Sequence, residues 1–92
     1  TASIFPHEME LWDSPLLCEV ATHPESGQKR VTLTGKVINN ARHILFLVTG
    51  SNKAEKVQEI IKKSGQWHNY PAARTSADKT TWLLDKDAAA LL

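Results

Sequence analysis

The pattern of apolar and polar residues predicts a buried strand, a helix and a second strand in the later part of the chain. Residues 44–48 form an unbroken apolar run, typical of a strand covered on both faces in a parallel sheet. An amphipathic helix is predicted over residues 53–63, because its apolar residues recur at helical spacing on one side. They are Ala54, Val57, Ile60 and Ile61. Residues 80–84 read as a second buried strand, and Asp85 as the cap of a closing helix rich in Ala and Leu.

The remaining patterns are shorter. A helical turn is predicted at residues 8–12, and strands are predicted at residues 16–21 and 31–34. The Pro- and Gly-containing segment 23–27 is a turn between these two strands. A short helix is expected at residues 36–41.

A longer segment, residues 66–79, has no clear period and is expected to be a functional or packed surface loop. The order strand, helix, strand, helix around it predicts an α/β fold with a mainly parallel sheet and flanking helices. Residues 1–92 are expected to belong to a single domain of this class.

Composition excludes several classes of function. Eleven Lys and Arg residues against ten Asp and Glu give a net charge of +1, so no nucleic-acid or anionic-membrane partner is expected. The longest apolar run is far short of the ~20 residues of a membrane helix. One cysteine excludes an intrachain disulfide and a Cys-rich zinc site, and neither a metal nor another cofactor is expected. A reducing, cytoplasmic location is the expectation.

The corner between the predicted strand and helix, Gly50-Ser51-Asn52-Lys53, is the best candidate for chemistry. In α/β sheets, ligands collect beyond the carboxyl ends of strands. The N–H groups at a helix N-terminus suit a phosphate, and an anion would offset the conflict between Lys53 and the helix dipole. The alternative is a solvated lysine on an ordinary helix, capped by Asn52 with Glu55 and ending near Gly65 in a left-handed cap.

Other candidates are weaker. No histidine has a nucleophile close to it in sequence. Cys18 lies in a predicted strand and is expected to be a buried small hydrophobe. Arg30 is a further candidate for phosphate binding, against the alternative of a surface ion pair.

Several segments, taken in order, resemble the 6-phosphogluconolactonase family. They are residues 1–6 (Thr-Ala-Ser-Ile-Phe-Pro), 29–34 (Lys-Arg-Val-Thr-Leu-Thr), 37–42 (Val-Ile-Asn-Asn-Ala-Arg), 46–50 with Lys53 and Ala54, 70–73 (Tyr-Pro-Ala-Ala), and 82–85 with 88–92. The resemblance spans the whole chain. It implies a fold shared with glucosamine-6-phosphate isomerases and deaminases, a three-layer α/β sandwich around a mainly parallel sheet.

The resemblance also implies that residues 1–92 are the C-terminal part of a longer α/β domain. In the family, an Asp-Gly-His triplet stands directly before the Thr-Ala-Ser segment. The catalytic histidine would therefore precede Thr1, and no catalytic residue is expected within residues 1–92. The family hydrolyses 6-phosphoglucono-δ-lactone to 6-phosphogluconate, with the histidine as general base. The family's phosphate-binding lysine corresponds to Lys53, and Arg30 is a weaker match.

One position separates the two related activities. Isomerases and deaminases place a Glu five residues after the triplet histidine, and that position is Phe5 here. Phenylalanine cannot transfer a proton, which favours lactone hydrolysis. A relative of the aldose-ketose isomerases and a non-catalytic domain that binds a sugar phosphate remain the alternatives. Self-association is expected through surface that the rest of a longer enzyme would cover.

Overall fold

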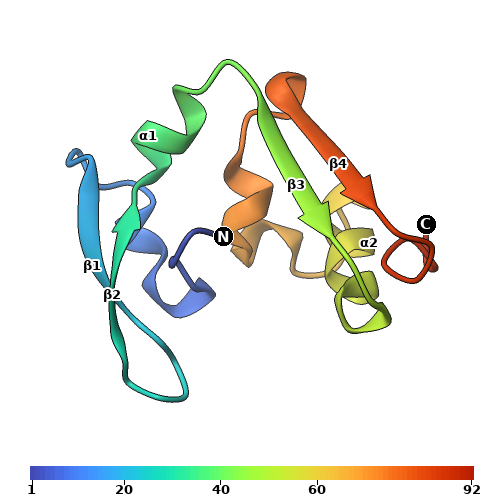
Figure 1. The fold of residues 1–92 in the computed structure, drawn as a ribbon, viewed down its shortest axis with the longest axis horizontal. Helices are drawn as coiled ribbons and strands as arrows, with labels where there is room; N and C mark the ends of the chain where they lie inside the picture. Colours follow the sequence, from blue (N-terminus) through green and yellow to red (C-terminus); the bar gives the residue numbers. More distant parts are fainter.

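The computed structural model describes residues 1–92, which form two two-stranded sheets set apart from one another (Figure 1). We refer to residues 1–43 as the hairpin half and to residues 44–92 as the crossover half. The N-terminal segment runs between the two sheets (Figure 1). The chain is therefore of the expected α/β class, although its strands form one antiparallel and one parallel pair rather than a single sheet.

In the hairpin half, β1 (Cys18–Thr22) and β2 (Lys29–Leu33) pair antiparallel, and Thr22 faces Lys29 beside the turn. Gly27 has a φ of +71° in this turn, which a glycine adopts at no steric cost. The short helix α1 (Gly35–Asn39) follows, and the 3₁₀ helix Pro6–Leu11 precedes the hairpin. The predicted strands, turn and helices of this half are thus present, with boundaries shifted by one or two residues.

In the crossover half, β3 (Ile44–Val48) and β4 (Thr80–Leu84) pair in parallel, as predicted, and α2 (Ala54–Lys62) lies between them in sequence. The amphipathic stripe of α2 is only partly covered: Val57 is 2% exposed, whereas Ile61 is 42% exposed. The predicted loop is a packed connection of three 3₁₀ helices. They span Trp67–Asn69, Pro71–Arg74 and Ala77–Lys79.

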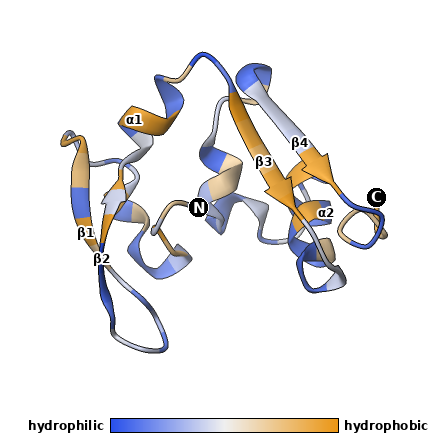
Figure 2. Cartoon of the chain, viewed as in Figure 1, coloured by the Kyte–Doolittle hydropathy of each residue, from blue (hydrophilic) through white to orange (hydrophobic).

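The prediction that β3 is an interior strand covered on both faces is wrong for this structure. β3 has one neighbour, β4, and its other edge is open. Leu45 and Leu47 are 64% and 77% exposed, because α2 covers the opposite face of the sheet. The outer face of β4 is also uncovered, because Leu83 is exposed there. β3 is apolar along its length (Figure 2), but no part of residues 1–92 covers the side chains on its outer face.

The predicted helix ends also need correction. Asn52 does not cap α2: residues Ser51–Lys53 form a 3₁₀ turn, and no side chain bonds to the start of the helix. The left-handed residue that ends α2 is Lys63, with a φ of +51°, two residues before Gly65. Asp85 does act as a cap, because its Oδ1 accepts the Ala88 N–H at 2.7 Å. Residues 86–91 nevertheless form turns, not a helix.

Buried residues are few and lie in both halves. The largest of the fully buried side chains are Ile4, Val57 and Thr34, which are 1%, 2% and 0% exposed, and Trp12 is 5% exposed. Cys18, expected to be buried, is exposed on β1. No helix has the length and the apolar composition needed to cross a membrane.

Candidate functional site

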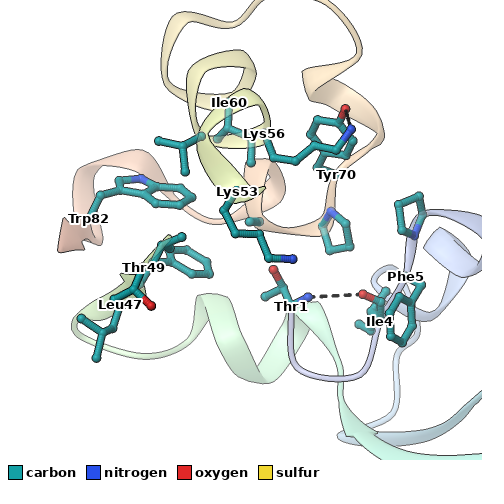
Figure 3. A pocket seen from close by; sticks show the side chains of 16 residues that line it. Thr1, Ile4, Phe5, Leu47, Thr49, Lys53, Lys56, Ile60, Tyr70 and Trp82 are labelled. Atoms are coloured by element: carbon teal, nitrogen blue, oxygen red, sulfur yellow. Dashed lines mark hydrogen bonds between the residues drawn. The ribbon is translucent and has the colours of Figure 1, made fainter. Parts of the chain in front are cut away.

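A pocket of about 550 Å³ opens between the two halves, beside the carboxyl end of β3 (Figure 3). Its walls come from the N-terminal segment, the end of β3, the start of α2, the 3₁₀ region at residues 70–72 and one residue of β4. The lining residues are Thr1, residues 4–6, residues 46–49, Lys53, Lys56, Val57, Ile60, residues 70–72 and Trp82. Parallel α/β folds place ligands at this end of their strands.

The pocket combines an apolar wall with positive charge. Phe46 and Trp82 stack with their ring centroids 4.5 Å apart. Lys53 and Lys56 supply two ammonium groups, and none of the lining residues is an Asp or Glu. Ammonium groups on the wall of a pocket beside an apolar surface favour an anionic ligand with an apolar or ring-shaped body.

Lys53 ends the 3₁₀ turn that precedes α2, and its side chain reaches toward Thr1 (Figure 3). Thr1 also lines the pocket, and burial and then the positive charge of Lys53 lower the pKa of its α-amino group. Lys53 and the Thr1 nitrogen therefore lie near each other in the pocket.

The rest of the predicted corner has a different role in the structure. Gly50 has a φ of +90° and a ψ of 153°, a conformation almost confined to glycine. Its N–H donates to both Asp85 carboxylate oxygens, at 3.2 and 3.1 Å, so Asp85 joins the ends of β3 and β4. Ser51 and Asn52 are exposed and do not line the pocket. Of the four corner residues, only Lys53 reaches it.

The structure does not bring Arg30 to this pocket. Arg30 lies on β2 in the hairpin half, exposed, and its Nε donates to Gln28 Oε1 at 3.0 Å. Within residues 1–92, no three His, Cys, Asp or Glu side chains gather in a way that could hold a metal ion.

Two polar residues of the pocket, Lys56 and Tyr70, were not among the predicted binding residues. Lys56 Nζ donates to the Tyr70 hydroxyl at 2.9 Å and lies 4.8 Å from the centre of the Tyr70 ring. The Tyr70 hydroxyl in turn donates to the Glu59 carboxylate, one turn further along α2. The spacing of Lys56 from Lys53 was a usable signal, because residues three apart share a helix face. Tyr70 gave no such signal, since only the folded connection brings it to α2.

The comparisons with known proteins agree with this arrangement. The family described as glucosamine-6-phosphate isomerases/6-phosphogluconolactonase matches residues 1–83. The chain belongs to this family. A 6-phosphogluconolactonase of Aggregatibacter actinomycetemcomitans is 47% identical to the whole chain. One of Treponema pallidum is 57% identical over 60 residues, which are 65% of this chain and 25% of that protein.

Two solved structures share the fold. The crystal structure of a devB protein superposes with a TM-score of 0.84 and 45% identity, covering 97% of this chain and 38% of its own. A 6-phosphogluconolactonase from Trypanosoma cruzi gives a TM-score of 0.79 and 29% identity, covering 99% of this chain and 36% of its own. The chain spans 40% of the Aggregatibacter relative, so these family members are much longer than 92 residues.

Proposed function

We propose that residues 1–92 are the C-terminal part of a 6-phosphogluconolactonase, which hydrolyses 6-phosphoglucono-δ-lactone to 6-phosphogluconate. The observation that carries the proposal is the pocket itself. It holds two lysines and no carboxylate beside stacked aromatic rings. A phosphorylated sugar lactone has matching chemistry, an anionic group attached to a ring. The names of the relatives that match the whole chain support the same activity.

In the proposed mechanism, Lys53 binds the phosphate of the substrate through charge-assisted hydrogen bonds. A water molecule attacks the lactone carbonyl while a general base takes its proton. The bond between the carbonyl carbon and the ring oxygen then breaks, and the ring oxygen leaves with a proton as the sugar's hydroxyl group. We assign the base to the family histidine that would precede Thr1. The position of Thr1 supports this assignment. Thr1 and Lys53 line the same pocket, so a residue bonded to the Thr1 nitrogen would lie close to Lys53.

The other predicted binding residues enter the proposal with smaller roles. Gly50 and Asp85 fix the turn from which Lys53 projects. Ser51 and Asn52 lie in that turn with their side chains outside the pocket. Arg30 enters only through its match to the family, since it lies on the hairpin.

A specific observation favours hydrolysis over isomerisation. Phe5 lines the pocket, at the position where the family's isomerases and deaminases would carry a proton-transferring Glu. A phenyl ring cannot exchange a proton with the sugar. The proposal therefore predicts turnover of the lactone and none of glucosamine 6-phosphate by the full-length protein.

The experiment is the substitution Lys53→Ala in the full-length protein. A hydrogen bond between charged groups contributes about 1.5–3 kcal/mol, so kcat/KM should fall about 10- to 150-fold. Lys53→Arg should restore only part of the activity, because a planar guanidinium does not replace a compact ammonium. Lys36→Ala is the matched control, since Lys36 lies on α1 and bonds to the Pro15 carbonyl.

An unphosphorylated lactone separates anchoring from general damage. Wild type and Lys53→Ala should hydrolyse it at similar rates, and equal losses on both substrates would show that Lys53 does not bind the phosphate.

We further propose that residues 1–92 alone give no turnover above spontaneous hydrolysis. We also propose that this chain associates with itself through its bare sheet faces. We place the enzyme in the cytoplasm, where a free thiol such as Cys18 stays reduced.

A further inference from the structure

Lys56 is the second cation of the pocket, and the structure holds it in place. Tyr70 accepts a hydrogen bond from its ammonium and presents its ring face to the same group. Tyr70 is itself held by its hydrogen bond to Glu59. A lysine free in solution spreads over many rotamers, and fixing one of them normally opposes binding. Here the chain fixes the rotamer before any ligand arrives.

The surroundings of Lys56 keep its charge. The hydrogen bond from Lys56 to Tyr70 raises the lysine pKa above its ordinary value, and the negative charges of Glu59 and Glu55 raise it further. Lys56 is therefore an ammonium throughout the neutral range. The groups that face it are the neutral Tyr70 hydroxyl on the 3₁₀ connection and the carboxylates of Glu55 and Glu59 on its own helix. Lys53, the other cation of the pocket, stands one helical turn before it (Figure 3).

We propose that Lys56 is a specificity-determining residue that contacts the same phosphate as Lys53, with Tyr70 as its positioning residue. This inference rests on the proposed function, because it takes the anion in the pocket to be a phosphate. Lys53 is the residue before α2 and Lys56 lies in its first turn, and both line the pocket. Figure 3 shows the Lys53 side chain extending toward Thr1 and the Lys56 side chain toward Tyr70. A phosphate bound between the two side chains would contact both ammonium groups. Two cations on one phosphate favour its dianion over its monoanion.

The experiment measures competitive inhibition of the full-length enzyme by inorganic phosphate at pH 8, where the dianion dominates. Lys56→Gln should weaken inhibition about fivefold, as expected for an exposed charge contact. Tyr70→Phe, which keeps the ring, should weaken it about twofold. The double variant should be no weaker than Lys56→Gln alone, because Tyr70 acts through Lys56. Lys62→Gln is the matched control for net charge, since Lys62 lies on α2 outside the pocket and donates to the Leu91 carbonyl.

Two further readouts distinguish positioning from a structural role. Tyr70→Phe should lower the Lys56 pKa toward 10.5, measured by NMR of the lysine side chains, whereas a purely structural effect would leave it unchanged. At pH 5, where the monoanion dominates, the effect of Lys56→Gln should shrink by about half or more.

The outcomes keep the two proposals apart. If Lys53→Ala weakens phosphate binding and Lys56→Gln does not, the role of Lys56 is overturned and the proposed function stands. If the double variant is clearly weaker than Lys56→Gln, Tyr70 does not act through Lys56. If the wild-type enzyme neither hydrolyses the lactone nor binds phosphate, the proposed function fails.

Discussion

The inner face of the β1–β2 hairpin carries small and polar side chains, whereas the inner face of β3 and β4 carries large apolar ones. In the hairpin half, Thr32 and Thr34 are buried, and each is satisfied by hydrogen bonds. Thr32 Oγ1 accepts the Ser3 N–H at 3.0 Å, and Thr34 Oγ1 donates to the Leu16 carbonyl at 2.6 Å. In the crossover half, Phe46 and Trp82 stack on the side that faces α2.

The outer faces are alike, because both are apolar and bare. Val20 pairs with Val31 across the hairpin, and Val31 is 76% exposed; Leu47 of β3 is 77% exposed. In a pleated strand, side chains alternate between faces, so the hairpin turns its larger residues away from the rest of this chain. The comparison teaches that hydrogen bonds of buried polar side chains contribute to the interior of the hairpin half, whereas the inner face of β3 and β4 depends on apolar packing.

The largest expected effect comes from removing the indole of Trp12, a large buried apolar side chain of the hairpin half. Trp12 packs against Gly35 so closely that a Cβ on Gly35 would lie 2.5 Å from the indole. Trp12→Ala should lower the free energy of unfolding by about 3–5 kcal/mol, measured by urea denaturation. Trp67→Ala, at a half-buried site in the crossover half, is the control and should cost less than half as much. Equal losses would mean that Trp12 does not anchor its half.

A middle-sized effect is expected where the halves join. Asn39, at the end of α1, donates from Nδ2 to the Arg74 carbonyl at 3.0 Å and accepts the Ser76 N–H at 2.9 Å. Asn39→Ala should cost about 1–3 kcal/mol, because two backbone groups lose their partners. The neighbouring Asn40 is exposed, and Asn40→Ala should change stability by less than about 0.5 kcal/mol.

The Asn39 variant also tests whether the halves unfold as one. Amide resonances of β2 and β4 should lose intensity at the same urea concentration in the wild type and at different concentrations in Asn39→Ala. A single shared transition in the variant would show that other contacts couple the halves. The candidate for such a contact is the ion pair between Arg74 and Asp13, at 2.8 Å.

The smallest effect on stability is expected at the bare faces, where Leu47→Lys and Val31→Lys should each change it by less than about 0.5 kcal/mol. Their effects on self-association should differ. Parallel sheets are almost always covered on both faces, whereas antiparallel sheets tolerate water on one. Leu47→Lys should therefore lower the association constant about tenfold, which is about 1.4 kcal/mol, and Val31→Lys less. Sedimentation equilibrium measures both, and a larger effect of Val31→Lys would reverse the ranking.

Local signals explain what could be predicted from the sequence. Each of these patterns lies within a few consecutive residues: the apolar run at residues 44–48 and the helical stripe after it. The sequence therefore sufficed to predict β3, α2 and the strand β4 that pairs in parallel with β3. The cover of β3 was not predictable, because no residue of β3 reports what packs on it. The turn at Gly50 and the position of Lys53 followed from the strand end. The bond from Gly50 to Asp85 did not, since it joins residues 35 apart.

The same limit applies to the pocket. Lys53 was identified because its place, shortly after a strand-end glycine and at the start of a helix, can be recognised from one short segment of sequence. Tyr70 contacts Lys56 from a connection without periodicity, whose 3₁₀ turns are set by tertiary packing. Cys18 was misplaced because alternation along β1 does not reveal which face meets the rest of the molecule.

The different connections of the two sheets have a consequence for the order in which the chain folds. Thr22 pairs with Lys29 across a short turn, whereas the connection between Ile44 and Thr80 contains α2 and four 3₁₀ helices. Hairpins form within about 1–10 μs, and each doubling of a loop adds about 0.6 kcal/mol to its closure. The hairpin should therefore close first. Until β4 pairs with it, β3 has no partner strand within residues 1–92, and an unpaired apolar strand edge is a site of aggregation.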